Sequence, residues 1–271
     1  MQGQLESTTT WLDFLEGFGR LLFSLAIIGT GVETLIVISS LAPGPHKIVQ
    51  VIPWLPAIPL LVYPVGVIFV LCGVSLLLQR HVLVSSIALG VVMLLCGLAF
   101  DVPRHPSLMS AEWRTNVLEP IAIASLAWLA VAAVPGWLHR TSRYLIAIAL
   151  IVFGIAHFQV LTFIAMMVPG WIPWHQFWAV FFGLAFIAAG LSFATGYLQR
   201  WAALGLGLMF ALWLVTIHLP ILLTMLRTAG APQDPDKWSD VFIVAAFCGG
   251  FWILTRGPRG RADLSAGKTG N

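Results

Sequence analysis

The fold is decided by the stretch from Tyr144 to Gln199, which reads YLIAIALIVFGIAHFQVLTFIAMMVPGWIPWHQFWAVFFGLAFIAAGLSFATGYLQ. It contains no Asp, Glu, Lys or Arg. A membrane-spanning helix needs about 20 mostly apolar residues, so the stretch is long enough for two crossings. Its middle segment, VPGWIPWH from Val168 to His175, carries the prolines and glycine typical of a turn. The stretch therefore predicts two membrane-spanning helices joined by a short loop.

The composition of the whole chain agrees with this prediction. Of the 271 residues, 59% are apolar and 9% are charged, and the mean hydropathy is +0.94. A soluble protein of this length needs far more charge on its surface, so we expect an integral membrane protein whose first partner is the lipid bilayer. The net charge of +3 comes from scattered basic residues, which is not the pattern of a nucleic-acid-binding protein.

Eight apolar segments predict eight transmembrane helices. Their approximate bounds are 21–41, 58–78, 82–100, 117–138, 144–168, 174–198, 201–227 and 238–255. The tail from residue 257 to 271 is rich in Gly and Arg, and we expect it to be disordered.

Basic residues are distributed unequally between the two sides of these helices. One side receives Arg20, Arg80, Arg140, Arg143, Arg200, Arg256, Arg259, Arg261 and Lys268. The other receives Lys47, Arg104, Arg114, Arg227 and Lys237. The richer side is expected to be cytoplasmic, so both termini lie inside and the longer loops with Trp and Pro face outside. We expect function toward that outer face.

The two halves of the chain match at a shift of 117 residues. The matches are Trp54-Leu-Pro56 with Trp171-Ile-Pro173, Gly66 and Gly73 with Gly183 and Gly190, and Asp101-Val-Pro103 with His218-Leu-Pro220. An even number of helices per repeat gives both repeats the same topology. The predicted architecture is therefore all-α, with eight transmembrane helices as two tandem four-helix bundles, residues 1–140 and 141–256.

Glycines and tryptophans have structural roles in this prediction. Gly66 and Gly73, like Gly183 and Gly190, are two helical turns apart, which forms a stripe where another helix packs closely. Tryptophans near the predicted helix ends are expected in the interfacial belt, namely Trp54, Trp137, Trp171, Trp174, Trp201 and Trp238.

Ionisable residues inside the apolar segments are the candidate functional residues, because such groups are costly in a membrane. His157 and His218 lie in the second half, and Glu33 and Asp101 lie near their counterparts in the first. Each histidine could be a structural hydrogen-bonding group, line a pocket for a quinone or another small molecule, or ligate haem iron. No His-x-x-His or His-x-x-x-His pattern points to a metal site. Trp171 and Trp174, in the outer loop, complete the candidate ligand-binding set.

The second half resembles a known family. The anchors are Gly154-Ile-Ala-His157-Phe158, Val168-Pro-Gly-Trp-Ile-Pro173, Trp178, Gly183, Gly190, Arg200-Trp-Ala-Ala203, Leu208-Met-Phe210 and His218-Leu-Pro220. They resemble the DoxX-like family of small bacterial membrane proteins. The first half resembles it through the repeat, and departs at Glu33 or Thr34 and at Asp101.

The resemblance implies four-helix units in a bacterial cytoplasmic membrane, and some relatives are subunits of quinone-linked sulfur oxidoreductases. The leading hypothesis is an accessory membrane subunit that binds a lipid-soluble ligand such as quinone, or a redox partner, near His157 and His218. The alternatives are a catalytic oxidoreductase with quinone or haem b, and a purely structural subunit of a larger membrane complex. A periplasmic or membrane protein partner fits each reading.

Overall fold

The computed structural model describes residues 2–40, 50–52, 54–56, 58–101, 111–228 and 235–256. The long helices are α1 (Gln2–Ser40), α2 (Pro59–Leu77), α3 (Val82–Leu95), α5 (Ala111–Leu129), α6 (Gly136–Gln159), α8 (His175–Thr195), α9 (Gln199–Trp213) and α11 (Pro235–Ile253). Shorter elements are η1 (Cys96–Asp101), α7 (Leu161–Met167), η2 (Leu214–His218), α10 (Leu219–Arg227) and η3 (Leu254–Arg256). The strands β1 (Gln50–Ile52) and β2 (Leu55–Pro56) pair antiparallel.

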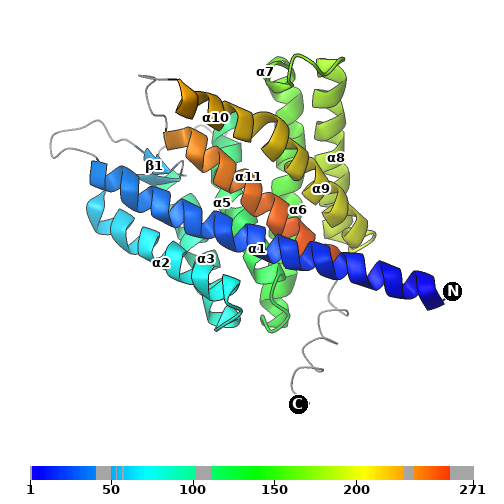
Figure 1. Cartoon of the computed structure of the whole chain (residues 1–271), viewed down its shortest axis with the longest axis horizontal. Helices are drawn as coiled ribbons and strands as arrows, with labels where there is room; N and C mark the ends of the chain where they lie inside the picture. Colours follow the sequence, from blue (N-terminus) through cyan, green and yellow to red (C-terminus); the bar gives the residue numbers. More distant parts are fainter. Residues whose placement is uncertain are drawn as a thin grey trace.

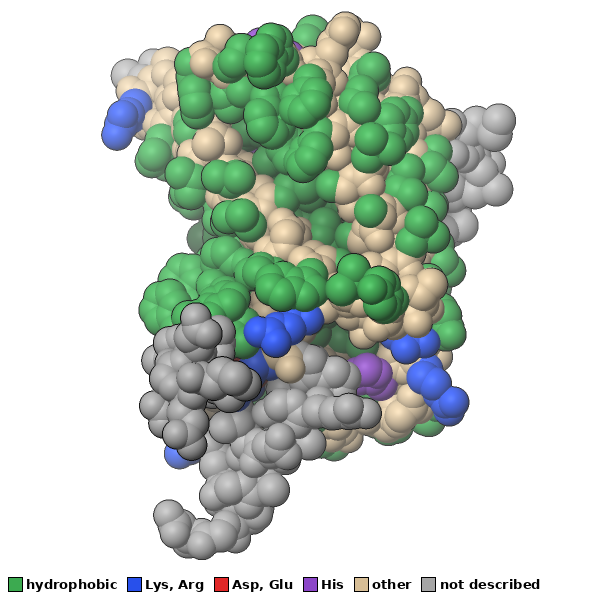
Figure 2. Space-filling model, turned by 90° about the vertical axis from the view of Figure 1, so that its right-hand side faces the viewer, with side chains coloured by type: hydrophobic (Ala, Val, Ile, Leu, Met, Phe, Trp, Pro, Cys, Tyr) green, Lys and Arg blue, Asp and Glu red, His purple; other side chains and the backbone are tan. Residues whose placement is uncertain are grey.

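The predicted all-α class is confirmed, and the helices fit a multi-pass membrane protein. Seven helices in the described ranges are long and apolar enough to span a bilayer, and the apolar helix Thr115–Leu129 is shorter. The face in Figure 2 is hydrophobic over most of its height, and most of its Lys and Arg gather toward the lower part. Such a surface is suited to lipid, because aliphatic side chains facing hydrocarbon carry no solvation cost.

The helices pack across the predicted boundary between the halves as extensively as within each half. Helix α1 packs along α2 and along α11, and helix α6 packs along α8 and along α5. Figure 1 shows α1 and α11 running side by side at a slant, with α6 beside α8. The last long helix of each half therefore lies against the first helix of the other half.

The most buried elements are the fourth long helix of each half, α5 and α11. Every residue from Ile121 to Leu129 is buried, and so is every residue from Ile243 to Phe251. The two helices meet where Leu126 lies over Gly250, since a Cβ on that glycine would lie 2.8 Å from Leu126 Cδ1. Within a bilayer this close fit replaces the hydrophobic drive that water would supply.

The predicted bounds of two helices are wrong. The predicted helix 117–138 ends too late, because α5 ends at Leu129. The predicted helix 144–168 begins too late, because α6 begins at Gly136. Pro135 precedes the first residue of α6, and a proline disfavours helical backbone in the residue before it. Residue 140, the predicted end of the first unit, therefore lies inside α6. The predicted disordered tail lies outside the described residues.

The hairpin was not predicted, and it removes Trp54 from the interfacial belt. Trp54 is 1% exposed, and its Nε1 donates a hydrogen bond to Glu119 Oε2 of α5 at 3.3 Å. The other belt tryptophans in the list above are exposed in the structure, as predicted. The reason is that Trp54 lies in the turn between β1 and β2, where its ring N–H bonds to α5.

The predicted glycine stripes are confirmed as contacts between helices, and the contacts recur in both halves. The pairs are Gly66 with Gly31, Gly73 with Ile28, Gly183 with Gly154, and Gly190 with Ile151. The first two join α2 to α1, and the last two join α8 to α6. The α2 and α8 glycines differ by 117 positions, as predicted, whereas the partners on α1 and α6 differ by 123.

Turn geometry and helix type recur as well. Gln79 and Gly196, which differ by 117 positions, both have positive φ, of 54° and 81°. The hydroxyl of Ser75 donates to Arg80 O, and the hydroxyl of Ser192 donates to Tyr197 O. Each half also has a π-helical turn at the end of its third long helix, η1 after α3 and η2 after α9.

Candidate functional site

His157 lies near the end of α6, at one of the close contacts between α6 and α8. Gly154 and Gly183 permit the approach, because a Cβ on Gly154 would lie 2.6 Å from Gly183 O. A Cβ on Gly183 would in turn lie 3.1 Å from His157 Cβ. The two glycines thus bring the imidazole against the side of α8, where it is half-buried.

The hydrogen bond of His157 fixes which ring nitrogen carries a proton. Its Nδ1 lies 2.8 Å from Phe153 O, one helical turn earlier. A carbonyl oxygen only accepts hydrogen bonds, so Nδ1 is the donor and carries the hydrogen. In the neutral ring Nε2 then holds a free lone pair. The Nε2 atom is buried and has no hydrogen-bond partner in the described part of the chain.

Two aromatic rings pack against the imidazole, and two more pack behind them. The Trp213 ring stacks on the imidazole with centroids 6.0 Å apart and planes 17° apart. The Phe186 ring meets it edge-on at 5.1 Å. Trp213 is held in turn by Phe182 at 5.2 Å and by Phe210 at 5.4 Å. We call the four rings Phe182, Phe186, Phe210 and Trp213 the His157 cage.

The four rings of the cage come from two helices, and His157 comes from a third, so no single sequence motif contains the site. Phe182 and Phe186 are on α8, one helical turn apart, and Phe210 and Trp213 are on α9. Trp213 is the last residue before the π-helical turn η2. Local π-helical turns inside longer helices often occur at functional sites, because the extra residue redirects the side chains around it.

The other candidate residues lie outside the cage. His218 is the last residue of η2 and is half-buried. The side chain of this region that stacks on His157 is Trp213. Trp171 and Trp174 are 75% and 77% exposed in the loop before α8. Asp101 ends η1, and its side chain lies outside the described ones. The prediction that His157 and His218 form one site stays a prediction.

Glu33 forms a second polar centre, between α1 and α11. It is 6% exposed, and its Oε1 accepts a hydrogen bond from Ser239 Oγ at 2.7 Å. Its Oε2 is buried without a partner in the described part of the chain. The residue after Glu33 is Thr34. The glycine contacts align it with His157, because Thr34 and His157 are 123 positions apart, as are the partner residues Gly31 and Gly154.

The position equivalent to the His157 cage is filled differently in the first half. Thr34 Oγ1 donates to Thr30 O at 2.6 Å, which repeats the bond from His157 to the carbonyl four residues back. At the counterpart of Trp213 stands Cys96, which is buried. The first half therefore has neither the imidazole nor the stacking tryptophan, although it keeps the same helix contacts.

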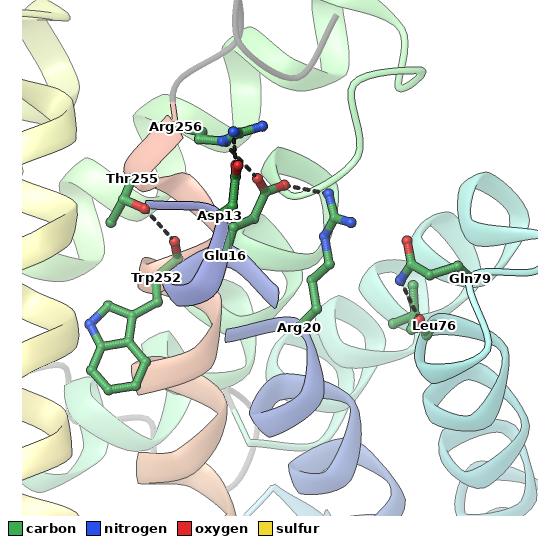
Figure 3. A network of polar contacts seen from close by, with 8 residues as sticks. All are labelled: Asp13, Glu16, Arg20, Leu76, Gln79, Trp252, Thr255 and Arg256. Carbon is green, nitrogen blue, oxygen red and sulfur yellow. Dashed lines mark hydrogen bonds and ion pairs between the residues drawn. The ribbon is translucent and has the colours of Figure 1, made fainter. Parts of the chain in front are cut away.

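The opposite end of α1 carries an ion-pair cluster, shown in Figure 3. Glu16 is 3% exposed and pairs with Arg20 and with Arg256, which also pairs with Asp13. These bonds join the first half of α1 to η3, so the first and last described helices are linked here. Figure 3 also shows Gln79, from the turn after α2, at the same end. Arg20 and Arg256 thus lie together, as the charge pattern predicts.

The cage residues were missed from the sequence, although part of the signal was present. Phe182 and Phe186 are four apart, and Phe210 and Trp213 are three apart, so each pair shares a helix face. Such pairs are ordinary in helix cores, and nothing local indicates that both faces meet at His157. In the described residues no group of three or more His, Cys, Asp and Glu side chains could hold a metal ion.

Comparisons of the chain with protein-family models, with curated proteins and with solved structures found no match.

Proposed function

We propose that the chain is an eight-span protein of the bacterial inner membrane, built from two tandem DoxX-like four-helix units with both termini in the cytoplasm. The recurring glycine contacts, positive-φ turns and π-helical turns support a duplicated unit. The grouping of Arg20 and Arg256 at one end supports the orientation, because the arginine-rich side of a membrane protein is normally cytoplasmic.

The proposed activity of this protein is that of an accessory membrane subunit that binds a lipid-soluble aromatic ligand at the His157 cage. One observation carries this proposal: the His157 Nε2 atom is buried in a ring that packs against Phe186 and Trp213, and it has no hydrogen-bond partner among the described residues. A buried polar atom without a hydrogen bond costs about 1–3 kcal/mol, so a ligand that satisfies it gains that amount. The equivalent position in the first half has no such atom, because the Thr34 hydroxyl donates its hydrogen to Thr30 O.

The chemistry of Nε2 favours a ligand that donates a hydrogen bond. Because Nδ1 donates to Phe153 O, the neutral ring presents only an acceptor. A quinol offers a phenolic hydroxyl for this acceptor and a flat ring for the face of Trp213. The oxidised quinone has carbonyl oxygens, which are acceptors, and it fits the neutral ring less well. His157 would also be placed to accept the quinol's proton when a redox partner removes electrons.

The test is the binding of a short-chain ubiquinol analogue and its quinone to the purified protein in lipid nanodiscs, followed by quenching of tryptophan fluorescence. We expect the quinol to bind about tenfold more tightly than the quinone, because one hydrogen bond of about 1.4 kcal/mol is a factor of ten. The His157→Leu variant should lose this preference. The Thr34→Val variant changes the equivalent position of the first half and should retain it.

Equal binding by His157→Leu and the wild type would refute the proposed site. An optical spectrum of the same preparation tests the catalytic alternative, because Nε2 is also the atom that haem iron would take. A Soret band that disappears in His157→Ala and His218→Ala would replace the proposed ligand with haem b. A preparation without bound ligand that also fails to bind the quinol would leave the structural-subunit reading.

A further inference from the structure

We propose that Glu33 is a proton-binding site: a neutral carboxylic acid, held by Ser239 in the contact between α1 and α11, whose proton exchanges with the aqueous side nearest Asp236. This site is separate from the His157 cage and does not depend on the ligand proposed there. It is formed by two helices that come from opposite ends of the chain, 206 positions apart at the two bonded residues.

The first argument is that the carboxyl group is enclosed and half satisfied. Glu33 is 6% exposed and Ser239 is 2% exposed. Ser239 Oγ donates to Oε1 at 2.7 Å, whereas Oε2 is buried without a partner in the described part of the chain. The fit around it is tight, because a Cβ on Gly29, one turn earlier on α1, would lie 2.3 Å from the Phe242 ring of α11.

The second argument concerns charge. The ionisable groups that α11 presents toward Glu33 are Asp236 and Asp240, whose carboxylates repel a negative charge there. Lys237, on the same turn, pairs with Asp240 at 3.7 Å. Helix α2, which packs on the other side of α1, contributes no Asp, Glu, Lys, Arg or His between Pro59 and Leu77. Among the described residues no cation pairs with Glu33; a buried carboxylate without such a pair costs several kcal/mol, and a bound proton removes that cost.

The third argument is the contrast with Glu16, on the same helix. Glu16 is buried to the same degree, at 3% exposed, but its two carboxylate oxygens are paired with Arg20 and Arg256. The cations stabilise a charged Glu16. Helix α1 therefore carries one buried glutamate paired with two arginines, and another buried glutamate that has no ion pair among the described residues.

The position of Glu33 determines the side with which its proton exchanges. Ser239 lies in the second turn of α11, and Asp236 in the first turn is exposed. The proton has only about one helical turn to cross, or roughly 5 Å, between the buried carboxyl and the exposed end of the helix. Ser239, with a hydroxyl that both donates and accepts, lies on that path. The chain thus has a carboxyl that can take up and release a proton from one face of the bilayer.

Infrared spectroscopy of the full-length protein in lipid at neutral pH tests this proposal. A protonated carboxyl group has a C=O stretching band separate from that of carboxylates and amides. We expect this band in the wild type, its loss in Glu33→Gln, and its retention in Glu16→Gln. Glu33→Gln keeps the length of the side chain and an acceptor oxygen for Ser239, so we expect it to fold. We also expect the wild-type band to shift on transfer to D₂O, which reports exchange.

Two results would overturn the proposal. A band that is absent from the wild type, or unchanged in Glu33→Gln, means that Glu33 is ionised. A band that is lost in Glu33→Gln but does not shift in D₂O means that the proton is trapped and no exchange occurs. A carbodiimide that reacts with protonated carboxyls in apolar surroundings gives an independent check by mass spectrometry, with modification expected at Glu33 and not at Glu16.

Discussion

Replacement of Gly249 by alanine should weaken the contact between α1 and α11, whereas replacement of an exposed glycine by alanine should leave that contact unchanged. An alanine Cβ at this position would lie 2.5 Å from Gly19 O and 2.5 Å from Phe23 N, and both atoms belong to the backbone of α1. Real Cβ atoms do not approach so closely, and a backbone atom cannot rotate away as a side chain does. The two helices must therefore separate along this contact.

The magnitude follows from two opposing effects. Overpacking typically costs about 1–3 kcal/mol, and a backbone clash belongs at the upper end. The replacement of glycine by alanine inside a helix returns about 1 kcal/mol, because glycine is the poorer helix former. We therefore expect the free energy of unfolding to fall by about 2 kcal/mol in Gly249→Ala.

Gly17→Ala is the matched control, because Gly17 is on α1 and an added Cβ there would meet nothing within 4 Å. Only the helix-propensity effect remains, so this variant should gain up to about 1 kcal/mol. The two variants should then differ by about 3 kcal/mol, which is more than a hundredfold in the unfolding equilibrium constant.

The assay is equilibrium unfolding of the purified variants in mixed micelles with increasing denaturing detergent, monitored by tryptophan fluorescence. A Gly249→Ala variant as stable as Gly17→Ala would refute the reasoning, since it would mean that α1 and α11 do not touch through their backbones. Gly19→Ala provides a check from the other side, because its Cβ would lie 2.7 Å from Gly249 O.

Two further predictions concern the ends of the helices. Arg256→Met removes a cation from the buried Glu16, so it should lower the free energy of unfolding by about 2 kcal/mol, whereas Lys237→Met removes an exposed pair and should cost under about 1 kcal/mol in the same unfolding assay. Gly196→Ala should lower the midpoint of thermal unfolding, because φ there is +81° and a Cβ in that conformation costs about 1 kcal/mol; Gly136→Ala, in open space at the start of α6, should not.

The membrane class and the glycine contacts were predictable from the sequence because they depend on local patterns. A run such as Pro59 to Leu77 is apolar around its whole circumference, so its membrane location follows without any knowledge of its neighbours. Gly66 and Gly73 are two turns apart on that helix, so a close partner on one side follows from their spacing. The partner itself, α1, is the preceding helix, and consecutive elements usually lie side by side.

The contact between α1 and α11 could not be predicted in this way. Its two polar residues, Glu33 and Ser239, are joined only when the end of the chain returns to its beginning. The sequence indicates that Glu33 is exceptional, because it stands inside an apolar segment. It does not indicate which helix supplies the partner, since hydrophobic periodicity is weak on helices that are apolar on every side.

The contact between His157 and Trp213 could not be predicted from the sequence, for a different reason. A helical wheel drawn through residues 201 to 227 assumes an α-helix throughout, but residues Leu214 to His218 form a π-helical turn. The longer turn alters the relative directions of Trp213 and His218. The sequence marks His218 as a candidate near His157 because it is ionisable, and it gives no sign of the tryptophan five residues before it.

The two halves together explain how one scaffold can hold a reactive group in one place only. Thr34 and His157 each donate to the carbonyl oxygen four residues earlier, at 2.6 Å and 2.8 Å, so the position has the same local geometry in both halves. A threonine hydroxyl that donates in this way has a single oxygen, which is turned toward its own helix. An imidazole has a second nitrogen on the far side of the ring, and this atom points away from the backbone. The change from threonine to histidine, with the helix contacts around it kept, therefore gives the second half a buried ring nitrogen that the first half does not have.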